Sequence, residues 1–240
     1  MNRLARKLEN FAPLSGDDKR FLEDVTRTSY EVPAGTDLIK EGDAPDNVHL
    51  ILDGFACRYK LTSEGNRQIM AYLISGDFCD LHVFILREMD HNIGTLSTCR
   101  LVKIPRDRIL EMTERPALAR ALWWATLVDE AVLREWLVNI GQREAPERLA
   151  HLLCELLLRL RAVGLSESDS YELPITQAEL ADTMGLSTVH VNRSLQKLRS
   201  ENLITLKNKY LVILDPDRLK EFGGFNPNYL HLPESQRKAN

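Results

Sequence analysis

Cysteine is scarce in this chain of 240 residues, and the few cysteines present lie far apart. No two of them form a CxxC pair, and none belongs to a cluster with zinc-ligand spacing. The four residues are Cys57, Cys79, Cys99 and Cys154. We therefore expect reduced, buried thiols and no metal site.

Long apolar runs and enzyme motifs are missing as well. No stretch approaches the ~20 apolar residues that cross a bilayer, and the opening residues MNRLARKLENF lack a signal-peptide core. We expect a cytoplasmic protein that does not contact a membrane. The sequence contains no nucleophile motif, no HExxH and no phosphate loop, so we do not expect an enzyme. A hydrophobic content of 44% suffices for one or two folded domains.

The most informative pattern that is present begins at Thr176. With Glu179 three residues later, Thr176 forms a capping box, which starts a helix. Gly185 stands where a chain leaving a helix often adopts a left-handed conformation, so the first helix ends there. Ser187 is suited to cap a second helix directly afterwards. The spacing predicts two short helices joined by a tight turn.

The second helix has an apolar side and a polar side. Val191, Leu195 and Leu198 fall on one stripe, which we expect to pack inward. Groups able to read base edges or to bind phosphate remain on the other side: Thr188, Val189, Asn192, Arg193, Gln196 and Lys197. This is a helix-turn-helix pattern, although any helical hairpin with a glycine turn gives a similar string.

Basic residues gather around this pattern. Two β-rich runs flank Lys207-Asn208-Lys209 and predict a hairpin with a basic tip, with Lys207 and Lys209 available to DNA. Arg193, Lys197 and Arg199 add to the same patch, although the whole chain has a net charge of −4. A local positive patch suffices for binding to phosphates, so these residues favour DNA over a protein partner.

The first half of the chain has a different residue pattern. Residues 1–27 suggest short helices, and from Ser29 to about Arg106 short β-rich runs alternate with turn glycines. We predict an α+β fold in which residues 1–115 form an antiparallel β domain of jelly-roll type. Residues 142–240 would form the winged helix-turn-helix domain, including a leucine-rich supporting helix at Glu147–Val163.

Residues 116–141 predict a long helix that opens at Pro116 and is followed by a hinge near Ile140 to Glu144. Its apolar residues repeat with a period near 3.5, which favours pairing with a second copy of the helix. The residues expected at that interface are Leu118, Leu122, Ala125, Asp129, Val132, Leu133 and Trp136. The alternative is that this stripe simply packs on the β domain.

The order of these parts resembles the Crp/Fnr superfamily of bacterial transcription regulators, the cyclic AMP receptor protein and its relatives. The segment PAGTDLIKEGDAPDNVHLILDGFACRYKLTSEGNRQIMAYLISGDF is similar to the β-roll of that family, and TQAELADTMGLSTVHVNRSLQKL is similar to its helix-turn-helix. The resemblance implies a homodimer that binds a two-fold symmetric operator, contacts RNA polymerase and senses an effector or redox signal through the β-roll. If the protein does not bind DNA, the alternative is an effector-binding β-roll with a protein-binding helical domain.

The resemblance also implies individual DNA contacts. Arg193 matches a guanine-reading arginine of the family, and Thr188 and Asn192 would face the same groove. At Val189 the family commonly has a glutamate, so this chain would contact a thymine methyl instead and prefer a different operator. Positions that often touch phosphate are matched by Gln177, Ser187 and Lys197.

The effector is not indicated by the sequence. The segment GDFCDLHVF puts Leu81 where cyclic AMP binders carry a ribose-binding glutamate, and no Arg-Ser pair follows, which argues against cyclic AMP. Residues 1–56 contain no cysteine, which argues against an iron–sulfur cluster of the Fnr type. Cys79 and His82 faintly resemble the haem ligand region of the carbon monoxide sensor of the family, so a haem or metal variant stays an alternative. An unidentified small molecule, a redox event and constitutive DNA binding are the others.

Overall fold

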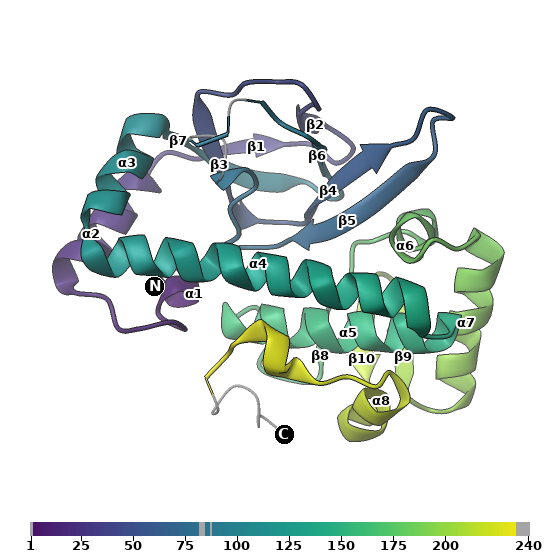
Figure 1. Ribbon diagram of the computed structural model, residues 1–240. Helices are drawn as coiled ribbons and strands as arrows, with labels where there is room; N and C mark the ends of the chain where they lie inside the picture. Colours follow the sequence, from purple (N-terminus) through teal and green to yellow (C-terminus); the bar gives the residue numbers. More distant parts are fainter. Residues whose placement is uncertain (1, 82–84, 87, 234–240) are drawn as a thin grey trace. The chain divides into compact units, whose positions relative to one another are not determined.

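The computed structural model describes residues 2–81, 85–86 and 88–233. The chain divides into two compact units, Met1–Asp129 and Glu130–Asn240, and the boundary lies inside the long helix α4 (Pro116–Gln142) (Figure 1). The predicted division treated this helix as a segment of its own. The boundary divides the residues of α4 between the two units. In the described part of the chain, no helix combines the length and the apolar character needed to span a membrane.

The first unit is an antiparallel β domain flanked by helices, as predicted. Its helices, besides the first half of α4, are α1 (Arg3–Leu8), α2 (Gly16–Val25) and α3 (Arg106–Glu114). Its strands are β1 (Tyr30–Val32), β2 (Asp37–Ile39), β3 (Asn47–Asp53), β4 (Ala56–Leu61), β5 (Arg67–Leu73), β6 (Asn92–Thr95) and β7 (Cys99–Pro105). They form two sheets with the orders β1-β7-β3 and β2-β6-β4-β5. The sequence predicted a β-rich region without individual strand bounds, and it did not predict α3.

Two hydrophobic clusters hold this unit together. One joins the helices to β3 and β7 through residues such as Leu22, Leu50 and Leu118, all of which are completely buried. The other fills the strands around Ile93. The turn between β3 and β4 requires a glycine, because Gly54 has φ of 90° and an added Cβ would lie 2.4 Å from the Thr98 carbonyl oxygen.

The second unit is built around the leucine-rich helix α5 (Ala145–Ala162), which packs against three other helices. These are α6 (Gln177–Met184), α7 (Thr188–Ser200) and α8 (Pro216–Phe222). A three-stranded antiparallel sheet of order β8-β10-β9 completes the unit, with β8 (Ser170–Glu172), β9 (Ile204–Lys207) and β10 (Tyr210–Ile213). A 3-10 turn, η2 (Pro227–Leu230), follows α8. The sequence predicted neither α8 nor η2, because each is short and buries only one or two side chains.

Candidate DNA-reading site

Helices α6 and α7 are joined as the predicted helix-turn-helix. The Thr176 hydroxyl accepts from the Glu179 amide at 3.2 Å, and the Glu179 carboxylate accepts from the Thr176 amide at 2.6 Å. Gly185 ends α6 with φ of 62°, in the left-handed region. The Ser187 hydroxyl then accepts from the His190 amide at 3.4 Å and caps α7. The capping box, the glycine turn and the second cap are confirmed.

Helix α7 packs one side into the unit and exposes the other. Val191, Leu195 and Leu198 are buried, as predicted. The opposite side carries the exposed residues Thr188, Val189, Arg193, Gln196 and Lys197, and Ser187 and Gln177 are exposed beside it. The structure therefore brings the predicted DNA-contact residues of α6 and α7 to one surface.

Several of these residues have partners within the chain. Asn192, half-buried on α7, donates to the side-chain oxygen of Gln177 at 3.2 Å. Lys197 pairs with Glu201 at 2.6 Å. Lys197 thus has an internal counter-ion, whereas Arg193 is an exposed guanidinium on the same face.

Strands β9 and β10 form the predicted hairpin with a basic tip. Lys207 pairs with Tyr210, so the connection contains only Asn208 and Lys209. Both have positive φ, 52° and 61°, which is the conformation of a type I′ hairpin turn. Lys207 and Lys209 are exposed there, in the same unit as α7.

Most of the residues predicted at the dimer interface on α4 are buried within a single chain. They are Leu118, Leu122, Ala125, Val132 and Trp136. Asp129 is half-buried and accepts from Arg58 at 3.1 Å. Of the predicted set, Leu133 alone exposes an apolar side chain. Packing on the β domain, the alternative given for this stripe, describes Leu118, Leu122 and Ala125, which belong to the core cluster of the helices with β3 and β7.

A different face of α4 exposes large apolar side chains. At 100° per residue, these positions cover an arc that runs from the border of the buried stripe, at Leu133, to the opposite side of the helix, at Leu127. They are Trp123, Leu127, Leu133, Leu137 and Val138. Trp123 and Leu137 are 69% and 73% exposed, which is unusual for residues of this kind on a single helix.

The β domain places Cys79 in its core. Burial raises the pKa of the Cys79 thiol well above its ordinary value, with Asp80 adding to the shift. Leu81 packs against the hydrophobic cluster of the helices. His82, the other residue of the predicted haem alternative, lies outside the described residues.

Arg58 on β4 holds the segment around Cys79 in place. Its guanidinium donates to the carbonyl oxygens of Cys79 at 3.1 Å and Phe78 at 3.0 Å, and to the Asp129 carboxylate on α4. Sequence analysis missed this residue, because an arginine in a strand usually points to solvent. Its role here is to fix the segment that follows the Gly76-Asp77-Phe78 turn.

The two units correspond to two domain models. Residues 30–115 match the model described as a cyclic nucleotide-binding domain, and residues 147–222 match the model of a Crp-like helix-turn-helix domain. This combination defines a DNA-binding regulator with an attached sensor-type domain.

Named relatives and solved structures match most of this chain. The chain is 30% identical over 201 residues to the transcriptional activator protein FnrL of Cereibacter sphaeroides, which covers 82% of this chain and 79% of the relative. It is 29% identical to the nitrogen fixation regulation protein FixK of Bradyrhizobium diazoefficiens, over 78% of each chain. The structure of FixK2 from Bradyrhizobium japonicum superposes with a TM-score of 0.73 at 22% identity, covering 81% of this chain and 96% of the other.

The protein belongs to the Crp/Fnr family of transcription regulators. It is a sequence-specific DNA-binding regulator and not an enzyme.

Proposed function

We propose that the protein binds a two-fold symmetric operator as a homodimer, with one α7 in each of two successive major grooves. The observation that supports this most directly is the exposed polar side of α7, with the basic tip of the β9–β10 hairpin in the same unit. Arg193 would read guanine, Thr188 and Asn192 would lie in the groove, and Val189 would contact a thymine methyl. Ser187, Gln177, Gln196, Lys197, Lys207 and Lys209 would contact phosphates or flanking edges.

The homodimer would form through the exposed apolar face of α4. Leu133 and Leu137 are exposed in the second half of the helix, and Trp123 and Leu127 extend the exposed apolar surface toward its start. A helix with its own core on one side and a second apolar face on the other is suited to pair with a copy of itself. Half-sites would then lie about 34 Å apart, one turn of DNA.

The output would be a contact with RNA polymerase, and the input would be sensed by the β domain. Leu81 supplies an apolar side chain where cyclic AMP binders carry a carboxylate, and this supports an effector other than cyclic AMP. A haem or metal variant would need Cys79, whose thiol is completely buried.

Selection of DNA sequences from a random pool, followed by titration at several salt concentrations, tests the proposal. We expect enrichment of a palindrome containing guanine in each half-site, and an affinity that falls steeply with salt. Salt-insensitive or absent binding to every fragment would contradict it and favour a protein-binding helical domain.

A further inference from the structure

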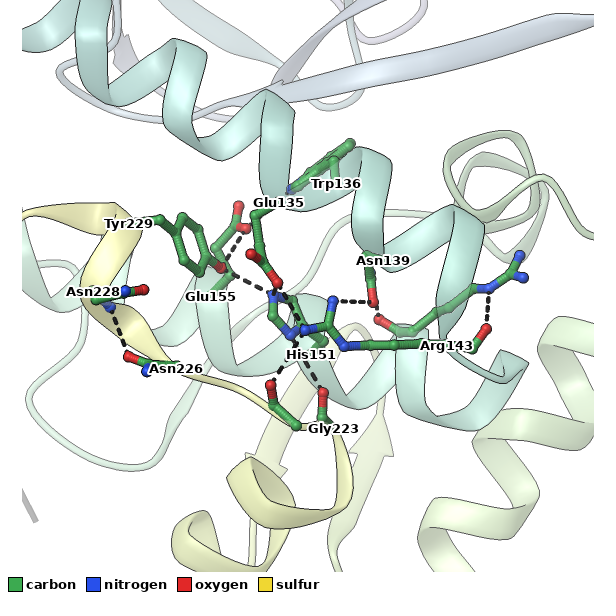
Figure 2. A network of polar contacts seen from close by, with 12 residues as sticks. Glu135, Trp136, Asn139, Arg143, His151, Glu155, Gly223, Asn226, Asn228 and Tyr229 are labelled. Atoms are coloured by element: carbon green, nitrogen blue, oxygen red, sulfur yellow. Dashed lines mark hydrogen bonds and ion pairs between the residues drawn. The ribbon is translucent and has the colours of Figure 1, made fainter.

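An acidic residue lies in the middle of the leucine-rich helix α5. Glu155 is completely buried, and its carboxylate contacts the side chains of Trp136, Arg159 and Tyr229. Figure 2 labels Trp136 and Tyr229 beside it. Trp136 on α4 donates to its Oε2 at 3.0 Å, and Arg159 donates to its Oε1 at 3.1 Å. The Tyr229 hydroxyl lies 2.9 Å from the same Oε2. Glu155 is thus the point where α4, α5 and the C-terminal segment meet within this unit.

His151, one helical turn before Glu155, continues this chain of contacts. Its Nε2 lies 3.1 Å from the Tyr229 hydroxyl, and its Nδ1 lies 3.3 Å from the Gly223 carbonyl oxygen. Its ring stacks on Tyr229, with 5.9 Å between centroids, and meets the edge of Phe225 at 5.0 Å. The order of contacts is Gly223, His151, Tyr229, Glu155 (Figure 2).

A count of the hydrogens shows that this series of contacts, from Gly223 through His151 and Tyr229 to Glu155, lacks one proton if His151 is neutral and Glu155 is ionised. The Gly223 carbonyl only accepts, so Nδ1 of His151 must carry a hydrogen. In a neutral ring Nε2 then accepts, and it takes the single hydrogen of the Tyr229 hydroxyl. An ionised Glu155 would need that same hydrogen. Every contact is satisfied only if one more proton is present, on Glu155 or on His151.

The surroundings favour Glu155 as the carrier. Burial raises the pKa of Glu155, while Arg159 is the main opposing influence. Burial lowers the pKa of His151 to about 4, and the charge of Arg143 adds to this. Burial and the nearby Glu155 also raise the pKa of Tyr229, so its hydroxyl stays protonated.

The remaining charged and titratable neighbours come from α4, α5 and β8. Glu135 on α4 lies 3.6 Å from Nε2 of His151, but it pairs with Arg143 at 2.7 Å. Because Glu135 is paired with Arg143, its carboxylate stabilises a proton on His151 less than an unpaired carboxylate would. On β8, burial raises the pKa of Tyr171, which donates to the Leu153 carbonyl. Cys154 on α5 is a buried thiol whose pKa burial raises to about 12.

The same end of α4 is hydrogen-bonded toward the helix-turn-helix. Asn139, buried one turn after Trp136, donates to the Arg148 carbonyl at 3.2 Å. The Arg148 guanidinium donates in turn to the Met184 carbonyl at 3.0 Å, next to the turn before α7. Arg148 therefore connects the last turns of α4 to the turn that precedes α7.

We propose that Glu155 is a positioning residue for DNA recognition. It holds a proton that is shared through hydrogen bonds with Tyr229 and His151. When every hydrogen bond of this series is made, it fixes the last turns of α4 and the C-terminal segment on α5. Loss of the proton leaves an ionised Glu155 and Nε2 of His151 competing for one hydrogen, which loosens this joint. The link to operator binding rests on the proposed function, since it assumes that α4 and α7 set the geometry of the dimer on DNA.

The proton itself is tested in the unmodified protein by NMR, with ¹⁵N-labelled histidine and ¹³C-carboxyl-labelled glutamate. At pH 7 we expect a neutral His151 ring with its hydrogen on Nδ1, and the carboxyl shift of a protonated acid for Glu155. An imidazolium ring at His151, or a neutral ring beside a Glu155 carboxylate, would overturn the proposal. Tyr229→Phe removes the hydroxyl that connects the two groups and should uncouple their titrations.

The effect on DNA is tested by operator affinity as a function of pH, at constant ionic strength. Above the pH at which Glu155 loses its proton, the logarithm of the wild-type dissociation constant should rise by up to about one per pH unit per protomer. His151→Phe keeps the aromatic packing but needs no hydrogen from Tyr229, so its profile should be flat. A wild-type profile as flat as that of His151→Phe would overturn the positioning role. Absence of operator binding at every pH would instead count against the proposed function, and the NMR result would still decide where the proton lies.

Discussion

Arg148, in the first turn of α5, donates from its guanidinium to the main-chain carbonyl of Met184, 3.0 Å away. Met184 is the last residue of α6 and precedes the left-handed Gly185 that leads into α7. The same guanidinium donates through Nε to the Arg143 carbonyl at 2.7 Å. One side chain therefore ties the α4–α5 connection to the turn of the helix-turn-helix.

Replacing Arg148 should weaken this joint. Arg148→Met keeps the aliphatic stem but removes both donors, and we expect a loss of about 2 kcal/mol in the free energy of unfolding, because hydrogen bonds from a charged group are among the stronger ones. Urea denaturation measures it. The exposed Arg120 on α4 provides the control, and Arg120→Met should leave stability nearly unchanged. Equal stability of the two variants would contradict the role of Arg148.

Arg193 should carry base specificity without contributing to the fold, since it is exposed on α7. Arg193→Ala should cost about 1 to 3 kcal/mol of operator affinity and remove the preference for guanine at one position in each half-site. Fluorescence anisotropy with the selected operator and with its guanine-substituted version measures both. Lys207→Ala is the matched control: it should weaken binding to every sequence alike and lower the salt slope by about one. Undiminished discrimination in Arg193→Ala would refute its place in the groove.

The exposed face of α4 predicts which substitutions separate the protomers. Leu137→Asp should give a folded monomer with reduced operator affinity, because the side chain is 73% exposed within one chain and contributes little to its core. Light scattering and a thermal melt measure assembly and folding together. Leu110→Asp, at an exposed position on α3, should remain dimeric. Leu122→Asp should instead unfold the β domain, since Leu122 belongs to its core. A dimeric Leu137→Asp would exclude this face.

Local signals in the sequence were sufficient for the DNA-reading half. The capping box at Thr176, the left-handed Gly185 and the two-residue turn at Asn208 each depend on neighbours within a few residues. The apolar repeat of about 3.5 residues also located one apolar side of α4 correctly. Such a repeat does not show whether that side packs against the same chain or against another. Glu155 and Tyr229 are 74 residues apart, so their contact depends on tertiary packing that no local pattern encodes.

Gly223 should be required for the approach of the C-terminal segment to α5. A Cβ added there would lie 2.7 Å from the backbone nitrogen of His151, which the helix holds in place. Gly223 has φ of −85°, so alanine could adopt the backbone conformation, and the effect would be steric alone. We expect Gly223→Ala to lower the free energy of unfolding by roughly 1 to 3 kcal/mol, measured in urea.

Gly141 offers a control of opposite sign for that substitution. It lies in α4, and no heavy atom lies within 4 Å of the position of an added Cβ. Gly141→Ala should therefore raise the free energy of unfolding by about 0.5 to 1 kcal/mol. If both variants lost stability equally, close packing at Gly223 would not be the cause.

The cysteines should be inert in the folded protein. Burial raises the pKa of Cys99 to about 11 and of Cys154 to about 12, and it raises the pKa of Cys79 well above its usual range. At pH 8 the thiolate fraction of Cys99 would be about 0.1%, and all four side chains are also shielded from reagents. Alkylation followed by mass spectrometry should find them unmodified in buffer and fully modified in urea.

The same shifts have a definite sign for stability. Cys99 and Cys154 have folded-state pKa values above their unfolded value near 9, so their contribution to stability is complete below pH 9 and is lost as the pH rises through 11 to 12. The free energy of unfolding should therefore fall on the alkaline side. Ser200→Cys, at an exposed position on α7, provides a reactive thiol as the positive control for alkylation. Rapid modification of Cys79 in the folded protein at pH 8 would contradict its burial and would favour a redox signal sensed through the β domain.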